Sequence, residues 1–527
     1  MPLTMKAKIL INTVLLFCAL CQAASQLPMA DSLVRLYKLG VLSAITGNSN
    51  EAIKTLNAVS SASPALAPLA MEQLGDIAAK DGDSARAIAS YNQAANTTGL
   101  PPLYKQRLLD KVKVIKGDTL PIEQLPKPEK PKATEQDKLW LNAWNLEMAN
   151  NFKQAIATYK LAYNLQGKRT EEAHFRHALC YYKMKAYDST IVYLSEFRNK
   201  FPGSSYLLAG LFWQGKAHIA AGRTKEAHNI WNEIIQLDPF DYHAHRAMQL
   251  MGTTAATALN APLIPEHAAR AWLDSIPPAS PRKNLSKEDN IALLRGAALL
   301  SVEQPDVAAF FLDEYELNYP GNLLLQYDIA RAYETAGSKA KAFRVARRLA
   351  WRIPTKYRSH IPMRIQSIIY PSYYSSIIGK YAEQFKVDPL FVRAVMRQES
   401  IFDANIVSHA GAIGLMQVMP VTGKNIAAEL KEKNFTADSL YNPEIAIRYG
   451  TSYLQRRLKQ FNDDLVLTLS AYNAGAHNAT KWNNQRKGAE YDIFVENIGF
   501  LETRLYVKKV LGNYWTYQRL TAMPGYE

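Results

Sequence analysis

The chain has little cysteine, and this scarcity limits what can stabilise it. Three of its 527 residues are cysteines, and two of them, Cys18 and Cys21, lie in an N-terminal segment that we expect to be removed. Cys180 then remains alone, cannot form an internal disulfide, and is expected to be a buried apolar side chain. The sequence contains no cysteine cluster and no His-Glu-x-x-His motif. It therefore predicts no metal site and no cofactor.

The chain also begins with an apolar run too short to span a membrane. Ile9 to Cys21 is interrupted by two polar residues, whereas a spanning helix needs about twenty apolar residues. Two lysines precede the run and Gln-Ala-Ala follows it, which is typical of a secretory signal peptide over residues 1–24. A lipoprotein signal is the alternative, although Leu20 fits poorly before Cys21. We predict an exported protein without a stable membrane span.

Acidic residues are fewer than basic ones. The chain has 62 lysines and arginines against 47 acidic residues, a net charge of +15, or about +13 without the two signal lysines. Such an excess indicates attraction to a polyanion. No aromatic-basic RNA motif and no recognition-helix signature is present, so nucleic acid is not the predicted partner. Carboxylate-rich cell-wall peptides fit an exported protein better, and an ordinary solvated surface is the alternative.

Residues 27–354 have a helical, repetitive pattern. A small residue is followed twelve positions later by a second one, then by an apolar or aromatic residue four positions on, and finally by proline or glycine. The pattern starts at Gly75, Ala143, Ala178, Gly215, Gly296 and Ala330. Several starts are separated by 34 residues or twice that, the period of tetratricopeptide helix pairs, in which small residues let paired helices touch. We predict an α-solenoid that serves as a scaffold and offers a surface for protein partners.

Proline-rich stretches divide the chain, at Leu120 to Pro131 and at Asn260 to Pro281. Length alone suggests three or four domains. The predicted divisions are a signal peptide at 1–24, N-terminal helical repeats at 25–120, tetratricopeptide-like repeats at 121–260, a linker with further helical repeats at 261–364, and a last domain of another type at 365–527.

The last domain contains a carboxylate in an unusual setting. Asp388-Pro389 is a helix start, and Val392 and Met396 form an apolar stripe on which Glu399 falls next. A carboxylate on a buried face near the negative end of a helix tends to keep its proton. The run Gly411 to Pro420 contains three small residues that let a backbone approach a ligand. A protonated acid beside a cleft suits glycosidic bond cleavage; a solvated surface glutamate is the alternative.

Four stretches of this domain carry a family resemblance. They are Glu399-Ser400, Gly411 to Pro420, Ala471 to Gly475, and Phe500 to Val507. In this order they resemble the motifs of the soluble lytic transglycosylases, which cleave peptidoglycan with a goose-lysozyme-like catalytic domain. The resemblance covers about residues 370–520. It departs from the family pattern at Gly499, where proline is expected. An all-α protein is implied, with an α-solenoid followed by a lysozyme-like domain.

The resemblance implies chemistry with a single carboxylate. Glu399 would protonate the oxygen leaving N-acetylmuramic acid, and the acetamido carbonyl would stabilise the anomeric carbon. Glu399 would then take the proton of the 6-hydroxyl, which closes a 1,6-anhydro ring by an intramolecular attack. The substrate would be peptidoglycan glycan strands. The location would be the periplasm of a Gram-negative bacterium, with the outer membrane as a further possibility.

The motif positions also imply supporting roles. Ser408 would bind the acetamido group, Gln417 would orient sugar, and Tyr472 would position Glu399. Met416 and Met419 would form an apolar floor around Glu399, with core packing as the alternative. Asn473 would contact sugar or brace a turn, and Glu502 would pair with Arg504 or support the site near the cleft rather than act as a second catalyst. The predicted substrate-binding residues are Ser408, Gly414, Met416, Gln417, Met419, Tyr472 and Asn473, and the supporting residues are Ser400, Glu502 and Arg504.

Other functions stay open at this point. Asp403, four residues after Glu399, could be the second carboxylate of a lysozyme-type hydrolase that uses water; we favour a loop or capping role for it. A non-enzymatic repeat scaffold of a cell-wall or secretion complex is the alternative of another class. Retention of the acid and of all downstream motifs argues against that scaffold. The solenoid is expected to restrict access to the cleft and to favour chain ends.

Overall fold

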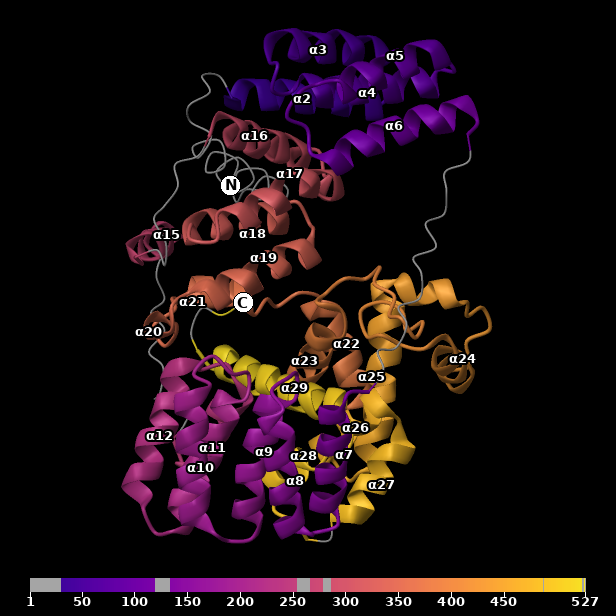
Figure 1. Ribbon diagram of the computed structural model, residues 1–527. Coiled ribbons are helices and arrows are strands. Elements are labelled where there is room, and N and C mark those ends of the chain that lie inside the picture. Colours follow the sequence, from indigo (N-terminus) through magenta and orange to yellow (C-terminus); the bar gives the residue numbers. More distant parts are fainter. Residues whose placement is uncertain are drawn as a thin grey trace. The chain divides into compact units, whose positions relative to one another are not determined.

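The computed structural model describes residues 30–118, 133–253, 266–277, 286–486, 488–523 and 526. Regular structure in these ranges is helical, with β-type pairing only in isolated bridges of Ile413 to Val407 and Val418 (Figure 1). The predicted all-α fold is confirmed. The signal segment and the proline-rich stretch at 120–131 lie outside the described residues. Of the second stretch, residues 266–277 are described and form a helix over Glu266–Ser275, so this part is helical and not the predicted linker. Among the helices described, none combines the length and apolarity needed to cross a membrane.

The chain divides into two compact units. The first comprises Met1–Pro126, Ile264–Ile353 and Arg364–Pro371, and the second Lys127–Leu263, Pro354–Met363 and Ser372–Glu527. Helices of the first unit are α2 (Ala30–Ile45), α3 (Ser49–Ala62), α4 (Ala67–Lys80), α5 (Ser84–Ala95), α6 (Pro102–Lys116), α15 (Glu266–Ser275), α16 (Lys287–Ser301), α17 (Pro305–Asn318), α18 (Leu323–Thr335), α19 (Lys339–Arg352) and α21 (Met363–Ile369).

The second unit joins a group of repeat helices to the C-terminal helices. Its repeat helices are α7 (Glu135–Met148), α8 (Phe152–Asn164), α9 (Thr170–Lys183), α10 (Tyr187–Lys200), α11 (Leu207–Ala220), α12 (Thr224–Leu237) and α13 (Tyr242–Leu250). Its other helices are α20 (Thr355–Arg358), α22 (Ser375–Phe385), α23 (Pro389–Ser400), α24 (Pro420–Glu429), η1 (Ala437–Tyr441), α25 (Pro443–Gln460), α26 (Leu465–Ala474), α27 (Ala476–Arg486), α28 (Tyr491–Glu496) and α29 (Leu501–Thr521).

The small residues of the repeat pattern act as predicted. Consecutive helices pack as pairs, among them α4 with α5, α11 with α12, and α16 with α17. A methyl group added at Gly75, Gly215 or Gly296 would lie 2.5 Å from Tyr91, 2.2 Å from Trp231 or 2.4 Å from Leu312, respectively. The bulky residue of each second helix thus rests on bare backbone of the first. Close packing at this point holds the pair together.

Local signals place the helix that carries Glu399. The Asp388 side chain accepts the Leu390 N–H at 2.7 Å, and Pro389 opens α23, so this start is confirmed. Val392 and Met396 are completely buried. The helix ends where Ile401 and Phe402 both take a left-handed conformation, with φ of 50° and 63°. This turn leads the chain from Glu399 directly into the loop of small residues.

Candidate active site

Glu399 lies in the last turn of α23 and is half-buried. The Tyr506 hydroxyl, on α29, donates a hydrogen bond of 2.6 Å to its Oε1. Burial raises the pKa of the Glu399 carboxyl to about 7; the Tyr506 hydrogen bond opposes this rise, and the negative charge of Glu502 adds to it. A carboxyl group with this pKa is present in both protonation states near neutral pH. It is therefore suited to give a proton and to take one back.

The tyrosine that contacts Glu399 differs from the expected one. The Tyr472 hydroxyl donates to the Met416 carbonyl at 2.7 Å, whereas the bond to Glu399 comes from Tyr506. Tyr472 nevertheless lies close enough to Glu399 for the two to interact. Burial raises the pKa of Tyr472 well above its usual value, and the negative charge of Glu399 adds to this rise. The predicted closeness of Tyr472 to Glu399 is therefore supported, while its hydroxyl bonds to the loop at Met416 and not to Glu399. Tyr506 belongs to the motif Phe500 to Val507. It lies four residues after Glu502, so the two side chains share one face of a helix, and this spacing could have indicated that Tyr506 faces the site.

The loop after Glu399 is built around Gly414. Gly414 has φ of 74°, and a methyl group there would lie 2.2 Å from the Leu440 carbonyl oxygen, so only glycine fits. The Ser408 hydroxyl accepts the Ala412 N–H at 2.9 Å. Asp403 accepts the Asn405 N–H at 3.0 Å. Asp403 thus has the loop role that we favoured for it.

Three further loop residues were assigned to the site. The Gln417 side-chain amide donates to the carbonyls of Ile406 and Gly414, at 3.3 and 3.0 Å. Met416 is completely buried and packs on the backbone of α25 at Gly450, whereas Met419 is 39% exposed. Met416 therefore belongs to the core beneath the loop, and of the two methionines only Met419 offers an exposed apolar surface.

Residues on α26 and at the end of α23 brace the site. Asn473 accepts a 2.6 Å hydrogen bond from the Thr503 hydroxyl, which ties α26 to the start of α29. The Ser400 hydroxyl is completely buried and donates to the Met396 carbonyl at 3.1 Å. Both side chains thus have partners within the protein. Of the two roles predicted for Asn473, this contact corresponds to bracing.

Of the two roles expected for Glu502, the pair with Arg504 is wrong. Glu502 is exposed, whereas Arg504 is buried and donates to Glu172 of α9 at 3.0 Å. Residues two apart on a helix point in different directions, which explains the separation. Glu502 instead faces the Glu399 side, where its charge contributes to the raised pKa of Glu399. Within the described ranges, no group of three or more histidine, cysteine or acidic residues is arranged to hold a metal ion.

The raised pKa of Glu399 predicts a pH-dependent gain in stability for Glu399→Gln. The folded-state pKa of about 7 exceeds the ordinary value of 4.5. Wild-type stability should therefore fall as pH rises from about 4.5 to 7 and stay reduced above that, by up to about 3 kcal/mol before solvent screening. Glutamine does not ionise, so urea unfolding should show the variant to be more stable than wild type at pH 8. An equal difference at pH 5 and pH 8 would contradict this explanation.

Two family models match the chain. Residues 376–495 match the transglycosylase SLT domain, and residues 172–204 match a tetratricopeptide repeat. The soluble lytic murein transglycosylase of Escherichia coli K12 is 35% identical over 144 residues, which are 27% of this chain and 22% of that protein. The membrane-bound lytic murein transglycosylase C of Haemophilus influenzae is 32% identical over 130 residues, 23% of this chain and 36% of that protein. The alignments thus span well under half of these relatives.

Solved structures resemble a larger part of the chain. The lytic transglycosylase Slt of Pseudomonas aeruginosa, determined as an inactive mutant, and the 70 kDa soluble lytic transglycosylase of E. coli each have a TM-score of 0.55 with 18% sequence identity. Each match covers 96% of this chain and 75% of the other. At this identity the likeness concerns the fold. The chain therefore carries a transglycosylase SLT domain at residues 376–495, within an all-α, repeat-containing fold like that of the soluble lytic transglycosylases.

Proposed function

We propose that the chain is a peptidoglycan lytic transglycosylase. It cleaves the β-1,4 bond between N-acetylmuramic acid and N-acetylglucosamine and leaves 1,6-anhydro-N-acetylmuramic ends. The observation that carries this proposal is the half-buried Glu399, whose pKa of about 7 and hydrogen bond from Tyr506 suit one carboxyl group to act first as an acid and then as a base. The SLT-domain match and the names of the relatives support it.

The reaction proceeds in two proton transfers through one side chain. Protonated Glu399 gives its proton to the glycosidic oxygen as the bond to the anomeric carbon breaks, and the acetamido carbonyl of the same sugar stabilises the positive charge. The Glu399 carboxylate then removes the proton of the 6-hydroxyl, whose oxygen bonds to the anomeric carbon. The attack within one sugar ring gains the high effective molarity of intramolecular reactions and needs no water. Glu399 ends protonated, ready for another cycle.

The loop supplies the substrate contacts in this proposal. Because the Ser408 hydroxyl accepts a backbone N–H, its own proton is directed to the acetamido group. The Gln417 amide nitrogen is bound to the loop, so its Oε1 receives a sugar hydroxyl. Gly414 allows the backbone to approach the sugar, and Met419 contacts its apolar face. Asn473 and Tyr472 hold α26 and the loop in place around the bound strand.

The location follows from the same function. Peptidoglycan lies outside the inner membrane, so the protein acts in the periplasm after export, either free or at the outer membrane. Its repeat helices give it a surface for protein partners. Nucleic acid and cofactors have no part in the reaction.

Product analysis of digested peptidoglycan tests this function. Purified glycan strands are incubated with the full chain and with Glu399→Gln, and the released fragments are identified by mass spectrometry. We expect anhydro ends from the wild type and none from the variant. Fragments heavier by one water, with reducing ends, would instead identify a lysozyme-type hydrolase. Equal digestion by both proteins would indicate that Glu399 has no catalytic role.

A further inference from the structure

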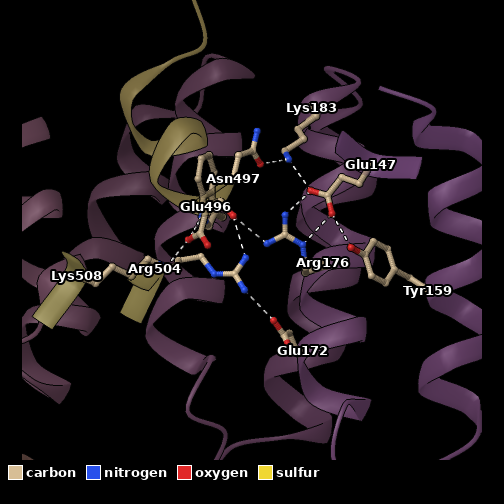
Figure 2. Close-up of polar contacts among 10 residues, drawn as sticks. Glu147, Tyr159, Glu172, Arg176, Lys183, Glu496, Asn497, Arg504 and Lys508 are labelled. Carbon is tan, nitrogen blue, oxygen red and sulfur yellow. Dashed lines mark hydrogen bonds and ion pairs between the residues drawn. The ribbon is translucent and has the colours of Figure 1, made fainter. Parts of the chain in front are cut away.

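Arg504 joins the candidate catalytic domain to the repeat helices of the same unit. Its guanidinium group donates to the Glu172 carboxylate on α9 and to the Glu496 carbonyl at the end of α28, both at 3.0 Å (Figure 2). Arg504 and Glu172 are 3% and 4% exposed. A charged pair so well shielded from water is much more sensitive to geometry than a surface pair. The first turns of α29 are thus attached to α9.

A second arginine reaches the same point from α9. Arg176 donates to Glu147 of α7 through two nitrogens, and its third contact is the Glu496 carbonyl at 3.2 Å. The two guanidinium groups, of Arg176 and Arg504, lie 4.3 and 4.9 Å from the centroid of the Trp144 ring. Lys183 extends the network by donating to Glu147 and to the Asn497 side chain. Figure 2 shows these groups converging on the turn between α28 and α29.

Helix α28 is held in the same manner. Its Asp492 accepts hydrogen bonds from Lys216 of α11 at 2.7 Å and from Arg246 of α13 at 2.8 and 3.1 Å. The Glu496 carboxylate accepts from Trp213 of α11 and from Lys508 of α29. The repeat helices therefore bind this segment through directed polar contacts. Buried ion pairs add little net stability compared with apolar packing, but they fix relative position.

The opposite side of α29 contacts the proposed catalytic acid. Tyr506 lies two residues after Arg504, so its side chain points away from α9, and its hydroxyl meets Glu399. Thr503 connects the same turn to Asn473 of α26. One turn of helix thus has the repeat region on one side and Glu399 on the other. A shift of Arg504 must be transmitted to Tyr506 because the helix between them is rigid.

We propose that Glu172 and Arg504 are positioning residues, through which repeat helix α9 holds Tyr506 against Glu399. This inference rests on the proposed function, because it gives the repeat helices a part in setting the proton affinity of the acid. The repeat region is then more than a scaffold. It completes the arrangement of the site from outside the sequence that matches the SLT domain.

The Tyr506 hydrogen bond provides a readout that general loss of stability would not change. A hydroxyl that donates to a carboxylate favours the charged form, so loss of this bond raises the pKa of Glu399. The other titratable groups that act on Glu399 are Glu502 of α29 and Tyr472 of α26. Neither is altered in the variants described next. A change in the Glu399 titration then reports the Tyr506 contact.

The experiment compares Glu172→Gln with Tyr506→Phe in the full chain. The Glu399 carboxyl is titrated by infrared difference spectroscopy, with Glu399→Gln as the blank. We expect Tyr506→Phe to raise the titration midpoint of the Glu399 carboxyl by about one pH unit, and Glu172→Gln to raise it as well. The double variant should move it no further than Tyr506→Phe alone. The alkaline limb of the pH–rate profile should follow these shifts, with about a tenfold lower kcat for Glu172→Gln.

A matched control is Glu72→Gln in the first unit. Glu72 is likewise a buried glutamate of a repeat helix, and it accepts a hydrogen bond of 2.7 Å from Tyr104 and pairs with Lys111, both on α6 of its own unit. It should lose comparable stability and leave the Glu399 titration unchanged. A folded Glu172→Gln with the wild-type titration overturns the proposal, as does an equal shift in Glu72→Gln.

Arg504→Lys keeps the inference testable if Glu172→Gln does not fold. Lysine retains the charge but cannot contact Glu172 and the Glu496 carbonyl with one planar group. We expect the same upward shift, and an unchanged titration would reject the positioning role. Because the infrared titration needs no substrate, it can succeed or fail independently of the peptidoglycan assay. The failure of this inference is therefore distinguishable from failure of the proposed function.

Discussion

Glu399→Gln lowers kcat on peptidoglycan by at least about 10³-fold, the largest effect expected of any single substitution in the chain. General acid–base catalysis contributes about 10²- to 10⁴-fold for one proton transfer, and Glu399 serves in both transfers of the proposed reaction. Glutamine keeps the size of the side chain and can still accept the Tyr506 hydrogen bond. The loss is therefore chemical, and it should appear in kcat with little change in KM. Timed release of soluble fragments from purified peptidoglycan measures it.

Glu444→Gln is the matched control for this substitution. Glu444 belongs to the same domain, at the start of α25, and its exposed carboxylate contacts Lys380 and Tyr381 on the surface. The same change of charge should leave kcat within about twofold, because exposed ion pairs contribute little. If Glu399→Gln retained more than a tenth of wild-type activity, another group would have to be the acid.

Features that depend on neighbouring residues could be predicted from the sequence. The Asp388 cap, the apolar stripe and the position of Glu399 follow from the helical period and from local capping chemistry. The small residues at the repeat positions identified which residues face each other in a helix pair, such as Gly215 and Trp231. Gly475, at the end of α26, has φ of 86°, a backbone conformation that favours glycine.

Partners far apart in the sequence could not be predicted. Arg504 was expected to pair with Glu502, but its carboxylate partner is Glu172, 332 residues away. The choice between Tyr472 and Tyr506 as the partner of Glu399 depends on how α26 and α29 pack against α23. No local pattern encodes such distances. Residue type, spacing and the family resemblance proposed the candidate residues, and tertiary packing decided their contacts.

Arg176→Met should lower the free energy of unfolding of the second unit by about 3–5 kcal/mol. Arg176 is 1% exposed, and its loss leaves the Glu147 carboxylate buried with Lys183 as its remaining cationic partner. Although burial favours the neutral form of Glu147, Arg176 and Lys183 hold the pKa of this carboxyl at about 2. In the wild type, the stability from this low pKa is present above pH 4.5 and is lost as pH falls toward 2. The variant should lose part of that acid sensitivity along with its stability, as urea unfolding at several pH values would show.

Arg198→Met separates the effect of burial from that of the ion pair itself. Arg198 of α10 also contacts a glutamate of another repeat helix through two nitrogens, Glu233 of α12, at 2.7 and 3.0 Å, but both side chains are partly exposed. Water solvates a Glu233 left without its arginine, so this variant should lose only about 0–1 kcal/mol. Equal losses of unfolding free energy in Arg176→Met and Arg198→Met would mean that the two-nitrogen contact, and not its burial, determines the loss. We expect a difference of at least about 2 kcal/mol, because the interior around Trp144 cannot solvate a carboxylate that has lost its arginine. The same burial makes the contact between α9 and the α28–α29 turn selective for one arrangement.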